Sequence, residues 1–169
     1  MDVDQCLRMI EDKYDFRFKE KQEESIKAIV QLNDTFITLP TGFGKSIIFF
    51  YLTEIFEALA GENSSIVVIS TLQALMLDQV QKLEKLSIKS VVVCEIRKDK
   101  GVGQKISEGQ FSIVFSSPEA AFTTGMWRKS LTSGVFHDRV KAVVIDEAHC
   151  ITEWGGEFRK EYDRLYELR

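Results

Sequence analysis

The sequence is poor in proline and cysteine and has no long apolar run. Only 2 of its 169 residues are proline and 28% are charged, which excludes a disordered or linker-like chain. No stretch approaches the roughly 18 consecutive apolar residues that a membrane-spanning helix needs. The first residues, MDVDQC, are acidic where a secretory signal is basic. The 3 cysteines lack metal-like spacing and favour a reducing, intracellular setting. Since no apolar run is long enough to span a membrane, no membrane partner is expected.

A basic excess is also missing. Lysine and arginine number 22 and aspartate and glutamate 26, so the net charge is −4. Surfaces that bind nucleic acid generally, through its phosphates, are usually basic. Charge alone therefore does not predict nucleic-acid binding, which must come from a few placed side chains or from sequence outside these residues.

What is present is a pattern of strands alternating with helices. Five runs rich in β-branched residues are predicted as strands: 35–39, 65–70, 90–94, 111–116 and 142–146. Their consecutive apolar residues are typical of strands covered on both faces, as in a parallel sheet. Helices are predicted over 22–32, 45–59, 72–86, 125–133 and 157–168, and a solvated loop over 95–104. The pattern predicts a three-layer α/β fold with a mainly parallel sheet.

A glycine-rich segment joins the first predicted strand to the helix after it. It consists of Thr41, Gly42, Phe43, Gly44, Lys45 and Ser46. Glycines let backbone N–H groups turn around phosphate oxygens at the start of a helix. Lys45 would reach the β- and γ-phosphates of a nucleotide, and the Ser46 hydroxyl would hold Mg²⁺. Leu39 stands where the phosphate-loop pattern has its first glycine, and the other interpretation is a simple glycine turn before a helix.

A pair of acids ends the last predicted strand, as a phosphate loop requires of a neighbouring strand. Asp146 would hold Mg²⁺ through its water shell, and Glu147 would orient and deprotonate the attacking water. Taken alone, two adjacent carboxylates are better explained as the acidic start of a helix. Paired with the Lys45 loop, they predict an ATP- and Mg²⁺-dependent hydrolase.

These motifs and their neighbours resemble a superfamily 2 helicase of the RecQ type over about residues 16–169. The segments that carry the resemblance are LPTGFGKS at 39–46 (motif I), VVISTLQALMLDQV at 67–80 (motif Ia), FSSPE at 115–119 (motif Ib), DEAH at 146–149 and CITEWGGEFR at 150–159, which is similar to the aromatic-rich loop of RecQ enzymes. The resemblance implies a RecA-like ATP-binding lobe that drives 3′-to-5′ movement on single-stranded or partial duplex DNA. It also implies a nuclear location if the source is eukaryotic.

The segment around Lys19 and Gln22 resembles motif 0, which recognises adenine in the family. An amide offers a donor and an acceptor, and both can match the edge of adenine. Lys19 stands where arginine is usual, so planar stacking on the base is lost. Tyr14 and Phe16 flank the place of the family's stacking aromatic. The alternative interpretation is that Gln22 is an ordinary polar residue that opens a helix.

The resemblance also implies DNA contacts. Candidates for backbone-phosphate contacts are Thr71, Ser116 and Ser117; Trp154 and Phe158 would stack on bases, and Arg159 would pair with a phosphate or a neighbouring motif. Gly156 occupies a position where the family usually has histidine, which predicts altered coupling between DNA binding and hydrolysis. Trp154 and Phe158 have a second interpretation, as core anchors of the last helix.

In organisation, residues 1–169 are predicted to be an incomplete first lobe, ending before the strand of motif III. The second lobe, with its arginine finger, is expected elsewhere in the full-length protein. We expect this piece by itself to fold marginally and not to unwind DNA. Two other functions stay open: another kind of P-loop ATPase, and a helicase-derived module that binds nucleotide or nucleic acid without unwinding.

Overall fold

The structure is a computed structural model that describes residues 1–94, 99–122 and 125–148. The chain divides into two compact units, Met1–Ser64 and Ser65–Arg169, which we call the amino-terminal unit and the sheet unit. In the described ranges, no helix has the length and apolar character needed to cross a membrane.

The amino-terminal unit contains four helices. These are α1 (Val3–Tyr14), α2 (Glu20–Val30), α3 (Lys45–Phe50) and α4 (Leu52–Ala60). The first helix begins with a capping box, in which the Gln5 N–H donates to Asp2 Oδ1 (2.8 Å) and the Asp2 N–H donates to Gln5 Oε1 (3.0 Å). Apolar faces of all four helices form the core of this unit, with Ile10, Ile26 and Ile55 fully buried.

Two predictions in this unit need correction. The strand expected at 35–39 does not form: the segment has no regular structure, and Phe36 is 84% exposed. A strand requires a neighbour for its backbone groups, and none of the described strands pairs with this segment. The helix expected at 45–59 exists but is interrupted at Tyr51, which lies between α3 and α4.

The sheet unit contains the four other predicted strands. They are β1 (Ser65–Ile69), β2 (Ser90–Val93), β3 (Ile113–Ser116) and β4 (Val140–Ile145). Their order is β2-β3-β1-β4, and every pairing is parallel. The predicted α/β class and parallel sheet are confirmed.

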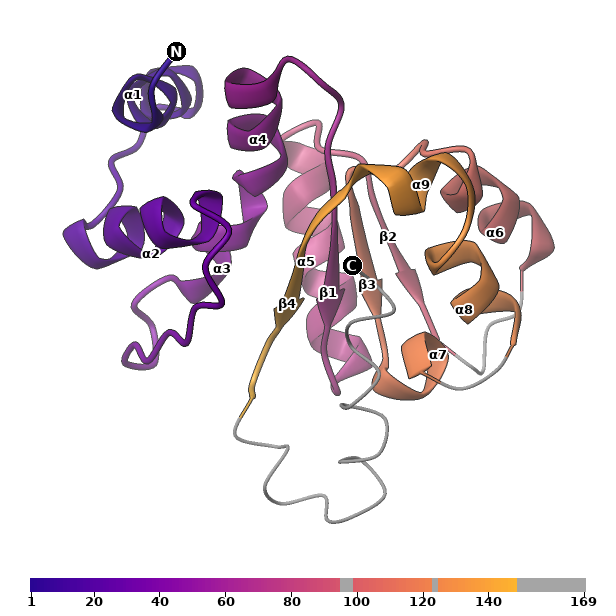
Figure 1. Cartoon of the computed structure of the whole chain (residues 1–169). Coiled ribbons are helices and arrows are strands. Elements are labelled where there is room, and N and C mark those ends of the chain that lie inside the picture. Colours follow the sequence, from indigo (N-terminus) through magenta and orange to yellow (C-terminus); the bar gives the residue numbers. More distant parts are fainter. Residues whose placement is uncertain (95–98, 123–124, 149–169) are drawn as a thin grey trace. The chain divides into compact units, whose positions relative to one another are not determined.

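Helices cover both faces of this sheet (Figure 1). Helix α5 (Gln73–Lys85) runs along one face, where Met76 and Leu83 are buried. On the other face, Val67, Ile69 and Val114 pack in one cluster with residues of four helices. These four are α6 (Lys100–Ser107), α7 (Pro118–Phe122), α8 (Met126–Leu131) and α9 (Gly134–Arg139). Successive strand residues point to opposite faces, so consecutive apolar residues are needed to fill both layers.

The loop predicted at 95–104 is wrong in its second half, because α6 begins at Lys100. Asp99 caps this helix by accepting hydrogen bonds from the N–H groups of Gly101 (2.9 Å) and Val102 (3.3 Å). The helix expected at 72–86 is confirmed as α5, and the one at 125–133 as the shorter α8. The helix expected at 157–168 lies outside the described residues.

Candidate nucleotide-binding site

The glycine-rich loop lies in the amino-terminal unit. Gly42 has φ +79° and Gly44 has φ +90°, values that favour glycine over other residues. The Phe43 N–H donates to the Pro40 carbonyl (3.2 Å), closing a turn, and Lys45 begins α3. Both Lys45 and Ser46 are half-buried. The loop thus has the left-handed glycines that a phosphate-binding loop requires.

Two side chains from the segment before this loop hold its backbone. The Gln22 Nε2 donates to the carbonyls of Phe43 (3.1 Å) and Gly44 (3.1 Å). The Lys19 Nζ donates to the same Phe43 carbonyl (3.1 Å) and lies 4.4 Å from the centre of the Phe43 ring. Gln22 is only 2% exposed, although it opens a helix. The structure therefore brings the predicted adenine-binding residues together with the loop, while adenine recognition itself stays a prediction.

The aromatic residues next to this segment pack on Tyr51. Phe16 stacks on Tyr51 at 5.2 Å between ring centres with 20° between the planes, and Tyr14 lies at 4.8 Å. The Tyr14 hydroxyl donates to Glu54, which also pairs with Lys13 (2.8 Å). Burial, with smaller effects of Tyr14 and Glu54, raises the pKa of Tyr51 to about 12. Tyr14 and Phe16 thus contribute to packing between α1 and the junction of α3 and α4.

The acidic pair lies in the sheet unit, in the turn that follows β4. The Asp146 N–H donates to the Ile69 carbonyl (2.9 Å), which extends the pairing of β1 with β4 by one bond. The Glu147 N–H donates to Asp146 Oδ1 (3.0 Å). Glu147 has φ +56°, which is uncommon for a residue other than glycine and often marks a functional turn. Since Lys45 belongs to the other unit, the binding of one triphosphate by all three side chains stays a prediction.

Gln79 of α5 was not among the predicted site residues. Its Nε2 lies 3.5 Å from Asp146 Oδ2, and the side chain is buried, with 8% exposed. A signal was available, because Gln79 is the polar member of the buried stripe that also contains Met76 and Leu83. An amide within an apolar stripe implies a polar partner, since buried polar groups are nearly always hydrogen-bonded.

The chemistry of these groups fits Mg²⁺ bound mainly by phosphate oxygens and water. Within the described residues, no three His, Cys, Asp or Glu side chains form a metal-binding cluster. Mg²⁺ typically takes one or two protein oxygens, keeps several waters and completes its shell with phosphates. The Asp146 carboxylate is oriented by Glu147 and Gln79, as metal-binding carboxylates are by their neighbours. The binding of Mg²⁺ by Asp146, and by Ser46 of the other unit, stays a prediction.

The predicted DNA-contact residues of motifs Ia and Ib lie at the carboxyl ends of β1 and β3. Thr71 and Ser117 are half-buried, and Ser117 Oγ accepts from the Ala120 N–H (3.3 Å). Ser116 is fully buried, and its hydroxyl donates to the Ser117 carbonyl (3.0 Å). Burial of Ser116 counts against a direct contact with DNA, so Thr71 and Ser117 are the better candidates. Trp154, Phe158 and Arg159 lie outside the described residues.

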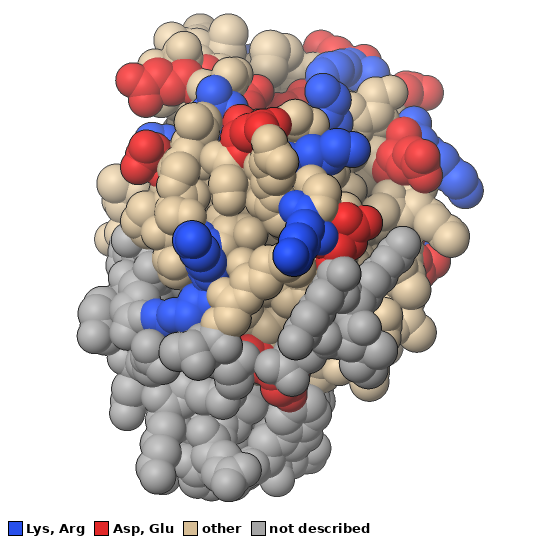
Figure 2. Space-filling model, turned by 90° about the vertical axis from the view of Figure 1, so that its right-hand side faces the viewer, with Lys and Arg blue, Asp and Glu red and all other residues tan. Residues whose placement is uncertain are grey.

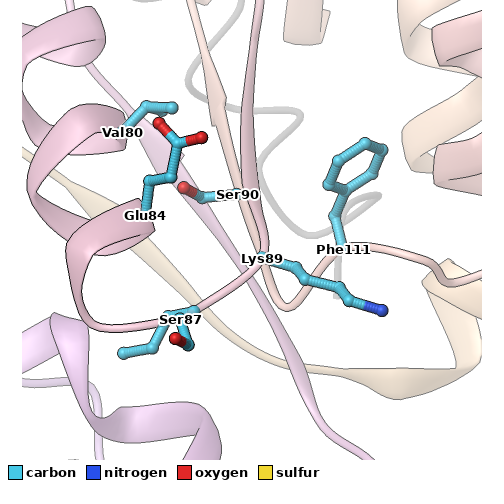
Figure 3. A pocket seen from close by; sticks show the side chains of 7 residues that line it. Val80, Glu84, Ser87, Lys89, Ser90 and Phe111 are labelled. Carbon is cyan, nitrogen blue, oxygen red and sulfur yellow. The ribbon is translucent and has the colours of Figure 1, made fainter.

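A hollow of about 330 Å³ lies at the opposite end of the sheet, beside the starts of β2 and β3 (Figure 3). Val80, Glu84, Lys89, Ser90 and Phe111 are among the residues that line it. Parallel α/β sheets bind ligands at their carboxyl ends, where Asp146 lies. This hollow is therefore separate from the acidic pair.

A parallel α/β sheet with acids at its carboxyl edge, together with a Gly-Lys-Ser loop, is typical of the class of P-loop nucleotide-binding proteins. The family model for DEAD/DEAH box helicases matches residues 19–169. The chain belongs to the DEAD/DEAH box helicase family, and membership implies the use of ATP.

Within this family the chain is similar to RecQ helicases. It is 33% identical over 170 residues to the ATP-dependent DNA helicase RecQ of Synechocystis sp., covering 99% of this chain and 33% of that protein. It is 32% identical over 155 residues to RecQ of Haemophilus influenzae, covering 90% and 23%. The ATP-dependent DNA helicase hus2/rqh1 of Schizosaccharomyces pombe is 33% identical over 157 residues, covering 90% and 12%. The chain thus spans a third or less of the length of these curated relatives.

Proposed function

We propose that this chain is the ATP-binding and ATP-hydrolysing lobe of a RecQ-type helicase that moves 3′ to 5′ along DNA. The observation that carries the proposal is the family match over 19–169, within which Lys45, Ser46, Asp146 and Glu147 are all intact. The relatives are named as ATP-dependent DNA helicases, which supports extending both ATP and DNA to this chain.

In the proposed reaction, Lys45 neutralises charge on the β- and γ-phosphates of ATP. Ser46 and Asp146 would hold Mg²⁺, Asp146 largely through bound water, and the ion would supply further positive charge. Glu147 orients a water molecule and takes its proton. The water oxygen bonds to the γ-phosphorus as the bond to the bridging oxygen breaks, so that ADP and phosphate are the products.

The proposed DNA contacts are few and specific in position. Thr71 and Ser117 would contact backbone phosphates, and Trp154 and Phe158 would stack on bases, with Arg159 beside them. On the face shown in Figure 2, basic and acidic side chains are mixed, with no broad patch of one sign among the residues shown in colour. On this face the charge therefore does not favour a general phosphate-binding surface, which would gather basic side chains.

ATP hydrolysis by the full-length protein, with the second RecA-like lobe present, is measured with and without single-stranded DNA and tests the proposal. We expect turnover stimulated by DNA and lost in both Lys45→Ala and Glu147→Gln. Glu147→Gln should still bind ATP, because it removes only the proton acceptor. Lys85→Ala is the matched control, since this exposed lysine ends α5 far from the carboxyl edge of the sheet.

The other outcomes identify the alternatives. ATP turnover that DNA does not stimulate would indicate another kind of P-loop ATPase. Nucleotide binding without turnover would indicate a binding module. We further propose that strand separation requires the second RecA-like lobe. A strand-separation assay that shows robust unwinding by the 169-residue chain would refute this last point.

A further inference from the structure

We propose that Lys19 and Gln22 are positioning residues of the phosphate loop, which orient its backbone N–H groups toward phosphate whatever the base of the nucleotide. This inference rests on the proposed function, in which phosphates bind at residues 41–46. The contacts that carry it are three side-chain hydrogen bonds onto two consecutive carbonyls, those of Phe43 and Gly44. We call this set of contacts the loop clamp.

The donors of Gln22 are fully used in the loop clamp. A primary amide has two N–H groups, and its Nε2 serves the Phe43 and Gly44 carbonyls at 3.1 Å each. Its Oε1 accepts from the Lys19 N–H at 2.9 Å. The side chain is 2% exposed. To donate a hydrogen bond to adenine, the Gln22 amide would have to give up a bond that it already makes inside the unit.

The clamp determines where the loop's donors point. In a planar trans peptide, the carbonyl and the following N–H point in opposite directions. The peptides after Phe43 and Gly44 are trans. Because Gln22 draws these two carbonyls toward itself, the N–H groups of Gly44 and Lys45 are turned away from it. Two successive N–H groups held in one direction are the arrangement that binds phosphate oxygens.

Lys19 adds a second anchor. Its Nζ bonds the Phe43 carbonyl and lies over the Phe43 ring, so the residue grips both the backbone and the side chain of one loop position. Gly44 allows the close approach, because a Cβ at this position would lie 3.0 Å from Gln22 Nε2. The clamp therefore depends on Gly44 as well as on its two donors.

Binding of three probes to the 169-residue chain with Mg²⁺ separates loop positioning from base reading. The probes are ATP, GTP and inorganic tripolyphosphate, titrated by calorimetry. Gln22→Ala should weaken all three by a similar factor, about tenfold for two neutral hydrogen bonds. Gln22→Met, which keeps the side-chain volume, should do the same. Lys19→Ala should weaken all three by a few fold, and Lys19→Arg, which keeps the donor and the ring contact, should restore most of the loss.

The matched control is Lys21→Ala, since Lys21 is exposed on the same helix and pairs with Glu24 (2.7 Å). A loss confined to ATP, with tripolyphosphate binding unchanged, would show base reading and overturn the proposal.

A second measurement needs no nucleotide. By NMR, the order parameters of the Gly44 and Lys45 amides should fall in Gln22→Met and stay unchanged in Lys21→Ala. Unchanged order in Gln22→Met would overturn the clamp. Failure of the wild-type chain to bind any of the three probes would instead refute the nucleotide site itself.

Discussion

Gly42 and Gly44 are two left-handed glycines in one loop, and they should respond very differently to alanine. At Gly42 (φ +79°) an added Cβ meets nothing within 4 Å, whereas at Gly44 (φ +90°) it lies 3.0 Å from Gln22 Nε2. A left-handed conformation costs alanine about 1–2 kcal/mol. Alanine also lowers the conformational entropy of the unfolded chain, which offsets this cost by about 0.4–1 kcal/mol. Gly42→Ala should therefore destabilise the amino-terminal unit by about 0–1.6 kcal/mol.

Gly44→Ala should cost more, because the Gln22 amide has to move. Two hydrogen bonds of about 0.5–1.5 kcal/mol each are at risk. We expect Gly44→Ala to exceed Gly42→Ala by about 1–3 kcal/mol. Hydrogen exchange of peptides that span 20–30 and 45–60, followed by mass spectrometry, reports the free energy of opening in this unit.

The double variant Gln22→Ala with Gly44→Ala identifies the source of the difference. If the clash with Gln22 is the cause, the two substitutions should be strongly non-additive, because each removes the same bonds. Equal destabilisation by the two glycine variants, or additivity in the double variant, would refute the reasoning.

Two further outcomes follow from burial. The raised pKa of Tyr51, about 12, favours its neutral form in the folded state, so this stabilisation is complete below the ordinary tyrosine pKa of about 10 and is lost as the pH rises toward 12. As the pH rises from about 10 to about 12, the free energy of unfolding should fall by about 2–3 kcal/mol less in Tyr51→Phe than in wild type. Parallel curves of unfolding free energy against pH for the two proteins would contradict this. Leu83→Ala should destabilise the sheet unit by about 2–5 kcal/mol in urea unfolding, because Leu83 is fully buried. The adjacent, exposed Lys82→Ala should cost under about 1 kcal/mol, and similar values for both would refute the packing argument.

Four of the five strands were predictable from their apolar runs, which are fully buried in β1 and β3 and largely half-buried in β2 and β4. Burial of this kind leaves a local signature, as in Ile66 to Ile69 of β1. The run at 35–39 carries a similar signature but forms no strand. Pairing depends on a distant partner, and a local pattern contains no information about whether one is present.

Two helices had local signals in their caps. Asp2 and Gln5 form the capping box of α1, a pattern that can be recognised in sequence. Asp99 caps α6, but Gly101 and Gly103 within that helix lower its intrinsic propensity and favour the loop interpretation. Propensity was overridden here by tertiary packing, since Ile106 is fully buried in the sheet unit.

The residue types of the candidate site were predictable from the sequence, whereas the contacts that hold these residues in place were less so. The glycine-rich pattern predicted Lys45, and pairing with that loop predicted roles for the acids at 146 and 147. The burial of Gln22 under the loop and the position of Gln79 beside Asp146 depend on contacts between segments far apart in sequence. Such contacts become visible only once the chain is folded.

The end of β1 supports two turns at once. The Ser70 N–H donates to the Ser116 carbonyl (3.0 Å), and the Ile69 carbonyl accepts from the Asp146 N–H (2.9 Å). Two adjacent residues, Ile69 and Ser70, thus bond both the end of β3 and the turn that contains Asp146 and Glu147. A slip of β1 by a single residue would break both bonds together and exchange the two layers of its side chains. As long as β1 keeps its register, both turns stay bonded to adjacent residues of the same strand.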